Sequence, residues 1–239
     1  MQPLLHRSLS VVIPCYNEEA RLPRTVREVS AFLAARGHDA EIVVVDDGSR
    51  DRTRAAAEAL RASDPSVRVV GFPRNHGKGF AVRAGFLAAT REAVLFSDAD
   101  LSTPVEELDG MWPWYDRGSD LVIGSRRLSG SRLEVPQPLH RRGMGRAFNL
   151  IVSTLAVRGF QDTQCGFKLF RRAALEPVFR GLKTRGFAFD VELLLLARRR
   201  GLRIREVPVR WINSPDSRVR VVRDSALMLR EILRMRGLL

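Results

Sequence analysis

Two acidic residues, one position apart, follow a short apolar run in the middle of the chain. Asp98 and Asp100 come directly after residues 93–96, Ala-Val-Leu-Phe, a run typical of a buried strand. Mg²⁺ and Mn²⁺ prefer oxygen ligands, and such ions are often held by one or two carboxylates together with substrate phosphates. The pair therefore predicts a site for Mg²⁺ or Mn²⁺ that also holds a diphosphate. A solvated turn would carry acidic residues in the same place, so the prediction depends on the other segments.

Polar side chains also follow the first expected strand. Tyr16, Asn17 and Glu18 come after an apolar run that ends at Pro14. An aromatic ring at this place could stack on a nucleobase, and the amide and carboxylate groups could bind a base or a ribose. Capping of the helix that follows explains the same residues more simply.

Two further polar segments follow later strands. Asp46 and Asp47 come after the second strand, where a carboxylate could accept a hydrogen bond from a base imide or a ribose hydroxyl. An ordinary Asx turn and N-cap is the alternative. Asn75 and Lys78 lie in a glycine-flanked segment at the start of a helix. An ammonium group beside a helix N-terminus favours phosphate binding.

The elements that must position these residues alternate along the first half of the chain. Strands are expected at 10–14, 41–46, 67–70, 93–97 and 120–124, and helices at about 19–35, 51–62, 78–90 and 103–117. This alternation is typical of an open α/β sheet, mostly parallel, with right-handed crossovers. Ligands bind such sheets beyond the carboxyl ends of the strands, where all the polar segments above fall.

The second half is less regular. Residues 125–142 are rich in Gly, Pro, Ser and Arg, which indicates a long loop. Helices are expected at 141–157 and 189–200, and strands at 165–170 and 202–207. No segment resembles an interdomain linker, so a single domain spanning 1–239 is predicted.

Composition excludes several classes of protein. With 239 residues and 45% hydrophobic content, the chain is too apolar to be disordered. The two cysteines lack metal-ligand spacing, no signal peptide or membrane-spanning run is recognised, and a cytoplasmic location is expected. The net charge of +13 favours anionic partners. Nucleic acid is not expected among them, because the arginines are scattered and not interleaved with aromatic residues.

The ordered motifs resemble a known family. Val-Ile-Pro-Cys-Tyr-Asn-Glu at 12–18, Val-Val-Asp-Asp-Gly-Ser at 44–49, Asn-His-Gly-Lys-Gly at 75–79 and Ser-Asp-Ala-Asp at 97–100 resemble the family 2 inverting glycosyltransferases of the GT-A fold. Residues 162–170 and 187–192 are similar to the dolichyl-phosphate β-glucosyltransferase branch and its bacterial polyprenyl-phosphate relatives. The resemblance runs from about residue 8 to residue 230.

This resemblance implies an arrangement of the site. Residues 8–125 would form a nucleotide-sugar-binding half and residues 126–219 an acceptor half, followed by an amphipathic helix over 220–239. Asp98 and Asp100 would hold the metal, and Gln164 and Asp190 would lie in the acceptor site. The residues implied in nucleotide-sugar binding are Pro14, Tyr16, Asn17, Glu18, Asp46, Asp47, Asn75, Lys78, Asp98, Ala99, Ser217 and Arg218.

The expected reaction moves a hexose, glucose from UDP-glucose, to a polyprenyl phosphate with inversion. A lipid phosphate is already anionic and needs no strong base, and Arg126 could clamp it bidentately. A hydroxyl acceptor on a glycolipid or a polysaccharide is the alternative, and it would require a carboxylate base, for which Asp190 is the candidate. A helix N-cap is the other interpretation of Asp190.

The last expected helix raises the question of membrane contact. Val222, Ala226, Leu229 and Leu233 form one apolar stripe, with Met228, Ile232 and Met235 beside it and arginines largely on the other side. Such a helix could lie on an anionic membrane surface, or it could pack on its own domain. We expect a peripheral position on the cytoplasmic face of the membrane; binding to a membrane partner or use of a soluble acceptor is the alternative.

Overall fold

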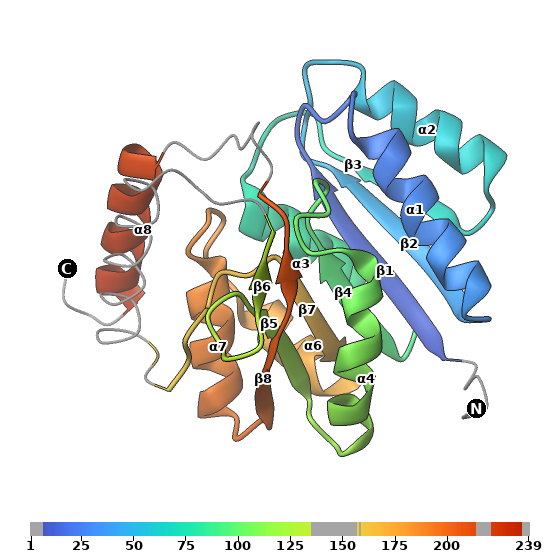
Figure 1. Ribbon diagram of the computed structural model, residues 1–239. Helices are drawn as coiled ribbons and strands as arrows, with labels where there is room; N and C mark the ends of the chain where they lie inside the picture. The colour runs from blue at the N-terminus through green and yellow to red at the C-terminus, as the bar shows by residue number, and fades with distance from the viewer. Residues whose placement is uncertain (1–6, 135–156, 158, 214–220, 236–239) are drawn as a thin grey trace.

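A seven-stranded sheet forms the centre of the molecule, with the strand order β3-β2-β1-β4-β7-β5-β8 (Figure 1). The computed structural model describes residues 7–134, 157, 159–213 and 221–235. The strands of this sheet are β1 Ser8–Cys15, β2 Asp39–Asp46, β3 Val67–Gly71, β4 Ala93–Ser97, β5 Leu121–Ser125, β7 Phe167–Arg171 and β8 Ile204–Pro208. A small second sheet pairs β6 Arg132–Leu133 with β9 Arg210–Trp211.

One strand runs against the others. β7 lies between β4 and β5 and is antiparallel to both, whereas the remaining pairs of the large sheet are parallel. Because of this reversal, the segment that enters β7 lies at the carboxyl ends of β4 and β5. The prediction of an open, mostly parallel sheet is confirmed, and β7 adds a turn to the edge where ligands bind such folds.

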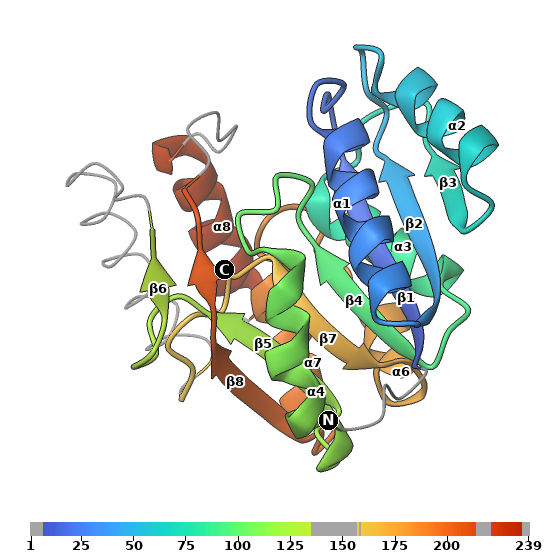
Figure 2. The same ribbon diagram turned by 45° about the vertical axis from the view of Figure 1, so that its right-hand side comes forward.

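Helices cover both faces of the sheet (Figures 1 and 2). They are α1 Leu22–Ala35, α2 Thr53–Ser63, α3 Lys78–Ala88, α4 Leu108–Asp116 after the 3₁₀ turn Val105–Glu107, α6 Arg172–Gly181, α7 Phe189–Arg199 and α8 Val221–Met235. Successive side chains of a strand point to opposite faces. Val12 of β1 therefore packs with residues of α3, α6, α7 and α8, while Val11 and Ile13 pack with residues of α1, α2 and α4.

The expected elements of the first half are all present, with boundaries that differ by a few residues. The predicted strand at 165–170 begins only at Phe167, since residues 165 and 166 belong to the turn before it. α6 was not predicted, and its interior contains Pro177, a residue that normally argues against a helix. The helix expected at 141–157 lies outside the described residues, apart from Val157.

α8 packs on the domain through one face. Met228 and Ile232 are buried in the core beside α7, while Leu227, Arg230 and Arg234 are exposed. The stripe expected through Leu229 and Leu233 is therefore not the most deeply buried one in the described part of this helix. No helix within the described ranges combines the length and the apolar character that crossing a membrane requires.

Candidate active site

The polar segments after β1 and β2 lie side by side because these parallel strands pair in register up to Cys15 and Asp46. Asn17 has a left-handed backbone with φ of 55°, and its side-chain oxygen accepts a hydrogen bond from Arg50 N at 2.7 Å. Glu18 N donates to Thr53 Oγ1 at 2.7 Å. The Asn17 amide thus fastens this segment to the loop after β2, while Pro14 and Tyr16 are partly exposed.

The two neighbouring aspartates after β2 have different surroundings. Asp46 Oδ1 accepts from Ser49 N at 3.1 Å, one residue further along the chain than the partner in an Asx turn. Asp47 is 2% exposed, and its carboxylate accepts from His76 N at 2.9 Å and from Gly77 N at 2.7 Å. Burial raises the pKa of Asp47, and these two hydrogen bonds lower it in part. Asp47 therefore shapes the loop of residues 75–77, to which Asn75 adds a bond from its Nδ2 to the Asp47 carbonyl at 3.3 Å.

Lys78 begins α3 and points to the end of β4. Its Nζ lies 2.7 Å from Asp98 Oδ1. Burial lowers the pKa of Lys78, but the charges of Asp98, Asp190 and Asp100 raise it by more. The net effect is a raised pKa, which favours the ammonium form. Gly77 before it has φ of 107°, and a Cβ there would lie 2.5 Å from the Arg185 carbonyl oxygen. Only glycine allows the helix to start at this distance from the loop that precedes α7.

Asp98 and Asp100 lie at the carboxyl end of β4, both partly exposed. Asp98 N donates to Gly166 O at 3.0 Å, and Gly166 lies directly behind the carboxylate, since a Cβ on it would be 1.8 Å from Asp98 Oδ2. Asp100 Oδ1 accepts from Ser102 N at 2.9 Å. The Ala99 carbonyl between them accepts from Thr25 Oγ1 at 2.6 Å. This hydrogen bond anchors the backbone between the two carboxylates to α1.

The two carboxylates fit a divalent ion that completes its coordination with water or phosphate oxygens. In the described part of the chain no group of three or more His, Cys, Asp or Glu side chains could hold a metal ion. Mg²⁺ typically takes one or two carboxylates and keeps the remaining positions for water and substrate phosphates. The donor set at this edge therefore suits such an ion in the presence of a diphosphate.

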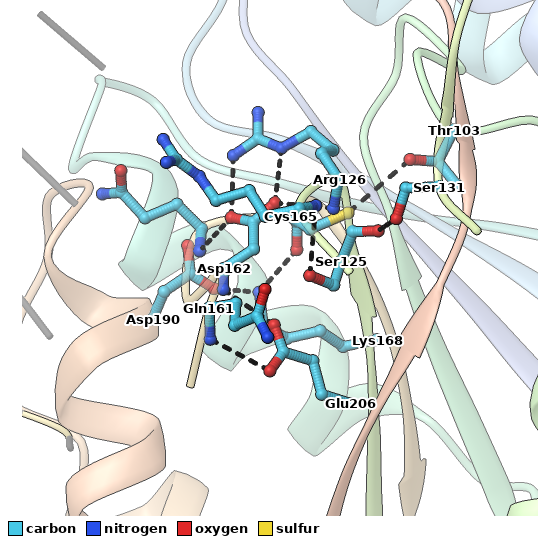
Figure 3. A network of polar contacts seen from close by, with 12 residues as sticks. Thr103, Ser125, Arg126, Ser131, Gln161, Asp162, Cys165, Lys168, Asp190 and Glu206 are labelled. Carbon is cyan, nitrogen blue, oxygen red and sulfur yellow. Dashed lines mark hydrogen bonds and ion pairs between the residues drawn. The ribbon is translucent and has the colours of Figure 1, made fainter. Parts of the chain in front are cut away.

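A network of polar contacts fixes the turn that enters β7 (Figure 3). Asp162 is 1% exposed and accepts from Arg126 Nε at 2.6 Å and from Arg126 Nη2 at 2.9 Å. Burial raises the pKa of Asp162, but the charge and hydrogen bonds of Arg126 outweigh it and lower this pKa to about 2. Gln164 N donates to Asp162 Oδ1 at 3.2 Å, and Gln164 Nε2 donates to Met228 Sδ at 3.6 Å. The turn thus connects Arg126, after β5, with α8.

A buried ion pair lies beneath the same turn. Lys168 Nζ is 2.6 Å from Asp190 Oδ1, and their side chains are 0% and 5% exposed. Lys168 Nζ also donates to the Cys165 carbonyl at 2.6 Å. Burial raises the pKa of Asp190, which the charges of Lys168 and Lys78 lower in part. The interpretation of Asp190 as an N-cap is wrong, because Ala188 is the N-cap of α7 and Asp190 lies in its first turn.

Most predicted residues within the described ranges therefore lie at one edge of the sheet. They differ in whether their side chains already bond other groups of the protein. Asn17 and Asp47 are engaged within the protein, and the side chain of Asp190 is paired with Lys168. Ser217 and Arg218 lie outside the described residues. Sequence reasoning assigned no role to Asp162, Lys168 or Glu206. Asp162 and Lys168 belong to the motif at 162–170. Lys168 is a charged residue inside a largely apolar strand, and this could have indicated a buried ion pair.

Comparisons with known proteins identify the family of this chain. The family model for glycosyl transferase family 2 matches residues 10–179. Dolichyl-phosphate beta-glucosyltransferase of Saccharomyces cerevisiae is 37% identical over 95% of this chain and 74% of its own length. Its human counterpart of the same name is 36% identical over 89% of this chain and 70% of its own length.

Solved structures confirm the predicted fold. Glucosyl-3-phosphoglycerate synthase from Mycobacterium tuberculosis in complex with uridine diphosphate has a TM-score of 0.71 at 23% identity, covering 98% of this chain and 81% of its own. The same enzyme in complex with Mn²⁺, UDP-glucose and phosphoglyceric acid has a TM-score of 0.70 at 23% identity, again over 98% and 81%. At this identity the likeness concerns the fold alone, which is of the GT-A type. With its motifs at the carboxyl edge and a family model matched over most of its length, this chain belongs to glycosyl transferase family 2.

Proposed function

We propose that this chain transfers glucose from UDP-glucose to a polyprenyl phosphate, with a divalent metal and with inversion at the anomeric carbon. Two lines support the donor and the acceptor. The relatives that are 36–37% identical are dolichyl-phosphate beta-glucosyltransferases. A solved enzyme of the same fold holds Mn²⁺ and UDP-glucose.

On the donor side, Asp98 and Asp100 would hold Mg²⁺ or Mn²⁺. The ion, when bound, supplies charge stabilisation to the diphosphate as it leaves. Lys78 adds an ammonium group at 2.7 Å from Asp98, at the start of α3, where the helix N-terminus also favours anions. Pro14, Tyr16, Glu18 and Asp46 are proposed to bind the uridine. The half formed by residues 8–125 would in this way bind the nucleotide sugar.

The acceptor is proposed to be a phosphate because of one observation, the pairing of Asp190 with Lys168. A hydroxyl acceptor needs a base that takes its proton, and this carboxylate is buried and held by an ammonium group at 2.6 Å. A phosphate is already anionic near neutral pH, so its oxygen can attack the sugar without a strong base. Arg126 is the cation proposed to bind it, within an acceptor half of residues 126–219. Attack opposite the diphosphate inverts the anomeric carbon.

A peripheral position at the cytoplasmic face of the membrane would bring the site to such a lipid. The exposed face of α8 carries Leu227, Arg230 and Arg234. Cationic side chains beside an anionic leaflet contribute about 1 kcal/mol each to binding. The described face of α8 is thus compatible with an anionic membrane surface, while Met228 and Ile232 hold the helix on the domain.

The test is transfer from radiolabelled nucleotide sugars to short-chain polyprenyl phosphate in the presence of Mg²⁺ or Mn²⁺. We expect label in the lipid fraction, strongest with UDP-glucose, and its loss with EDTA or in the Asp100→Ala variant. Asp116→Asn is the matched control, since Asp116 pairs with Arg7 ahead of β1, at the opposite end of the sheet. Donor consumption without lipid labelling would point to a hydroxyl acceptor. Wild-type turnover by Asp100→Ala would refute the metal assignment.

A further inference from the structure

Arg126 is held along one edge of its guanidinium group. Asp162 accepts from Nε at 2.6 Å and from Nη2 at 2.9 Å, and Trp211 lies with its ring centroid 5.6 Å from the guanidinium carbon. A guanidinium group has five N–H donors in a rigid plane. The edge formed by Nη1 and Nη2 therefore points away from Asp162, and the Arg126 side chain is 28% exposed. This arrangement leaves a second edge that suits bidentate binding of an anion.

The backbone of Asp162 is held by Glu206, a residue of β8. Glu206 Oε1 accepts from Asp162 N at 2.7 Å, and Glu206 Oε2 accepts from Gln161 N at 3.0 Å. Glu206 lies in β8, where it pairs in register with Ile123 of β5, three residues before Arg126. The strand that carries Glu206 thus neighbours the strand that leads to Arg126. The contacts run from Glu206 through the backbone of residues 161 and 162 to the Asp162 carboxylate and the guanidinium group (Figure 3).

The same turn reaches the candidate metal pair. Gly166 O accepts from Asp98 N at 3.0 Å, so one short segment lies against both Arg126 and Asp98. The charge of Asp162 compensates that of Arg126. Binding of a phosphate by Arg126 consequently depends more on the direction of the N–H groups that do not bond Asp162 than on net charge.

We propose that Asp162 and Glu206 are positioning residues that orient the second edge of Arg126 toward the acceptor phosphate. The proposal rests on the proposed function, because it assumes an anionic acceptor. Neither residue contacts the acceptor in this role. Their effect is to order the arginine side chain before binding, which reduces the entropy that binding must overcome.

The experiment is steady-state transfer by the full chain, with the concentrations of UDP-glucose and short-chain polyprenyl phosphate varied separately. In Asp162→Asn an amide N–H₂ group replaces an acceptor of the charge-assisted bonds. We expect KM for polyprenyl phosphate to rise about 10- to 100-fold. Glu206→Gln weakens bonds to neutral backbone groups and should raise the same KM about 2- to 10-fold. KM for UDP-glucose should stay at the wild-type value in both variants, and Asp116→Asn should leave both KM values unchanged.

A second variant separates positioning from direct binding. Arg126→Lys removes the bidentate edge, so adding Asp162→Asn to it should raise KM for polyprenyl phosphate no further. Full additivity of the two changes would overturn the proposal. So would an unchanged acceptor KM in Asp162→Asn, or an equal loss for both substrates.

Folding is followed by thermal unfolding and by calorimetric binding of UDP. If Asp162→Asn does not fold, the KM of Glu206→Gln for polyprenyl phosphate tests the positioning role instead. Failure of the wild-type chain to label any polyprenyl phosphate would overturn the proposed function together with this inference. Wild-type transfer with an unchanged acceptor KM in both variants would overturn the positioning role alone.

Discussion

Replacing Asp190 with asparagine removes one charge of a buried ion pair and leaves the other in place. Asp190 Oδ1 and Lys168 Nζ are 2.6 Å apart, and the side chains are 5% and 0% exposed. Two unit charges at this separation attract each other by roughly 6 kcal/mol at an effective dielectric constant of about 20. Truncating one partner of such a pair typically lowers the free energy of unfolding by about 3–5 kcal/mol. We expect Asp190→Asn to lose stability in this range.

Adding Lys168→Met removes the ammonium group that the first substitution leaves unpaired. Replacing both partners of a buried pair is often neutral for stability, so the double variant should recover most of the loss. Some loss of stability should remain, because the Cys165 carbonyl loses its hydrogen-bond donor. An unsatisfied buried acceptor costs about 1–3 kcal/mol. Urea unfolding of the wild type, Asp190→Asn and the double variant measures these differences.

Transfer rates of the same proteins test the role of Asp190. A general base contributes about 10²- to 10⁴-fold to a rate. If Asp190 serves only in the ion pair, the double variant should transfer glucose to polyprenyl phosphate within about 10-fold of the wild type. A folded double variant that binds UDP normally but is slowed by that larger factor would refute this reasoning and identify Asp190 as the base. A fully stable Asp190→Asn would refute the assignment of the buried pair.

Three other changes have defined outcomes. Gly166→Ala should weaken metal binding and slow transfer by about 10-fold or more, because its Cβ would lie 1.8 Å from Asp98 Oδ2 and would displace that carboxylate; a normal metal titration would contradict this. Gly79→Ala should instead lower stability in urea by about 1–3 kcal/mol, since its Cβ would lie 2.5 Å from Phe189 Cβ, and wild-type stability would argue against that packing. Burial raises the pKa of Glu41, but its hydrogen bonds outweigh this and lower the pKa from 4.5 to about 2. Its stabilisation, about 3 kcal/mol, should therefore be complete above pH 4.5 and lost as the pH falls to about 2, and Glu41→Gln should flatten this acid limb of a stability–pH curve.

The first half of the fold and the place of the site could be predicted because their signals are local. Runs such as residues 93–97 are continuous and apolar, and parallel strands bring their carboxyl ends to one edge. That rule placed Asp98, Lys78 and the segments after β1 and β2 together without any knowledge of contacts. The hydrogen bond from Ser49 N to Asp46 Oδ1 is likewise local, since the two residues are three positions apart.

The contacts around the turn that enters β7, on the proposed acceptor side, are not local, and this is why they could not be predicted. Asp162 meets Arg126 across 36 positions and Glu206 across 44, and nothing in either segment indicates the partner. The direction of β7 depends on pairing with strands far away in the sequence. Asp190 looked like an available base because its type and motif were visible, whereas its pairing with Lys168, 22 positions away, could not be read from either segment.

The reversed strand also determines how far the protein can be shortened. β7 lies between β4 and β5, and β5 pairs only with β7 and β8 among the described strands. A fragment that stops near residue 125 would contain every strand of the proposed donor half but would leave β5 without a neighbour and β4 with an open edge. Such open edges promote aggregation. The residues proposed to bind the donor therefore do not make up a separable module, and an expression fragment or chimaera needs to keep the chain through β8.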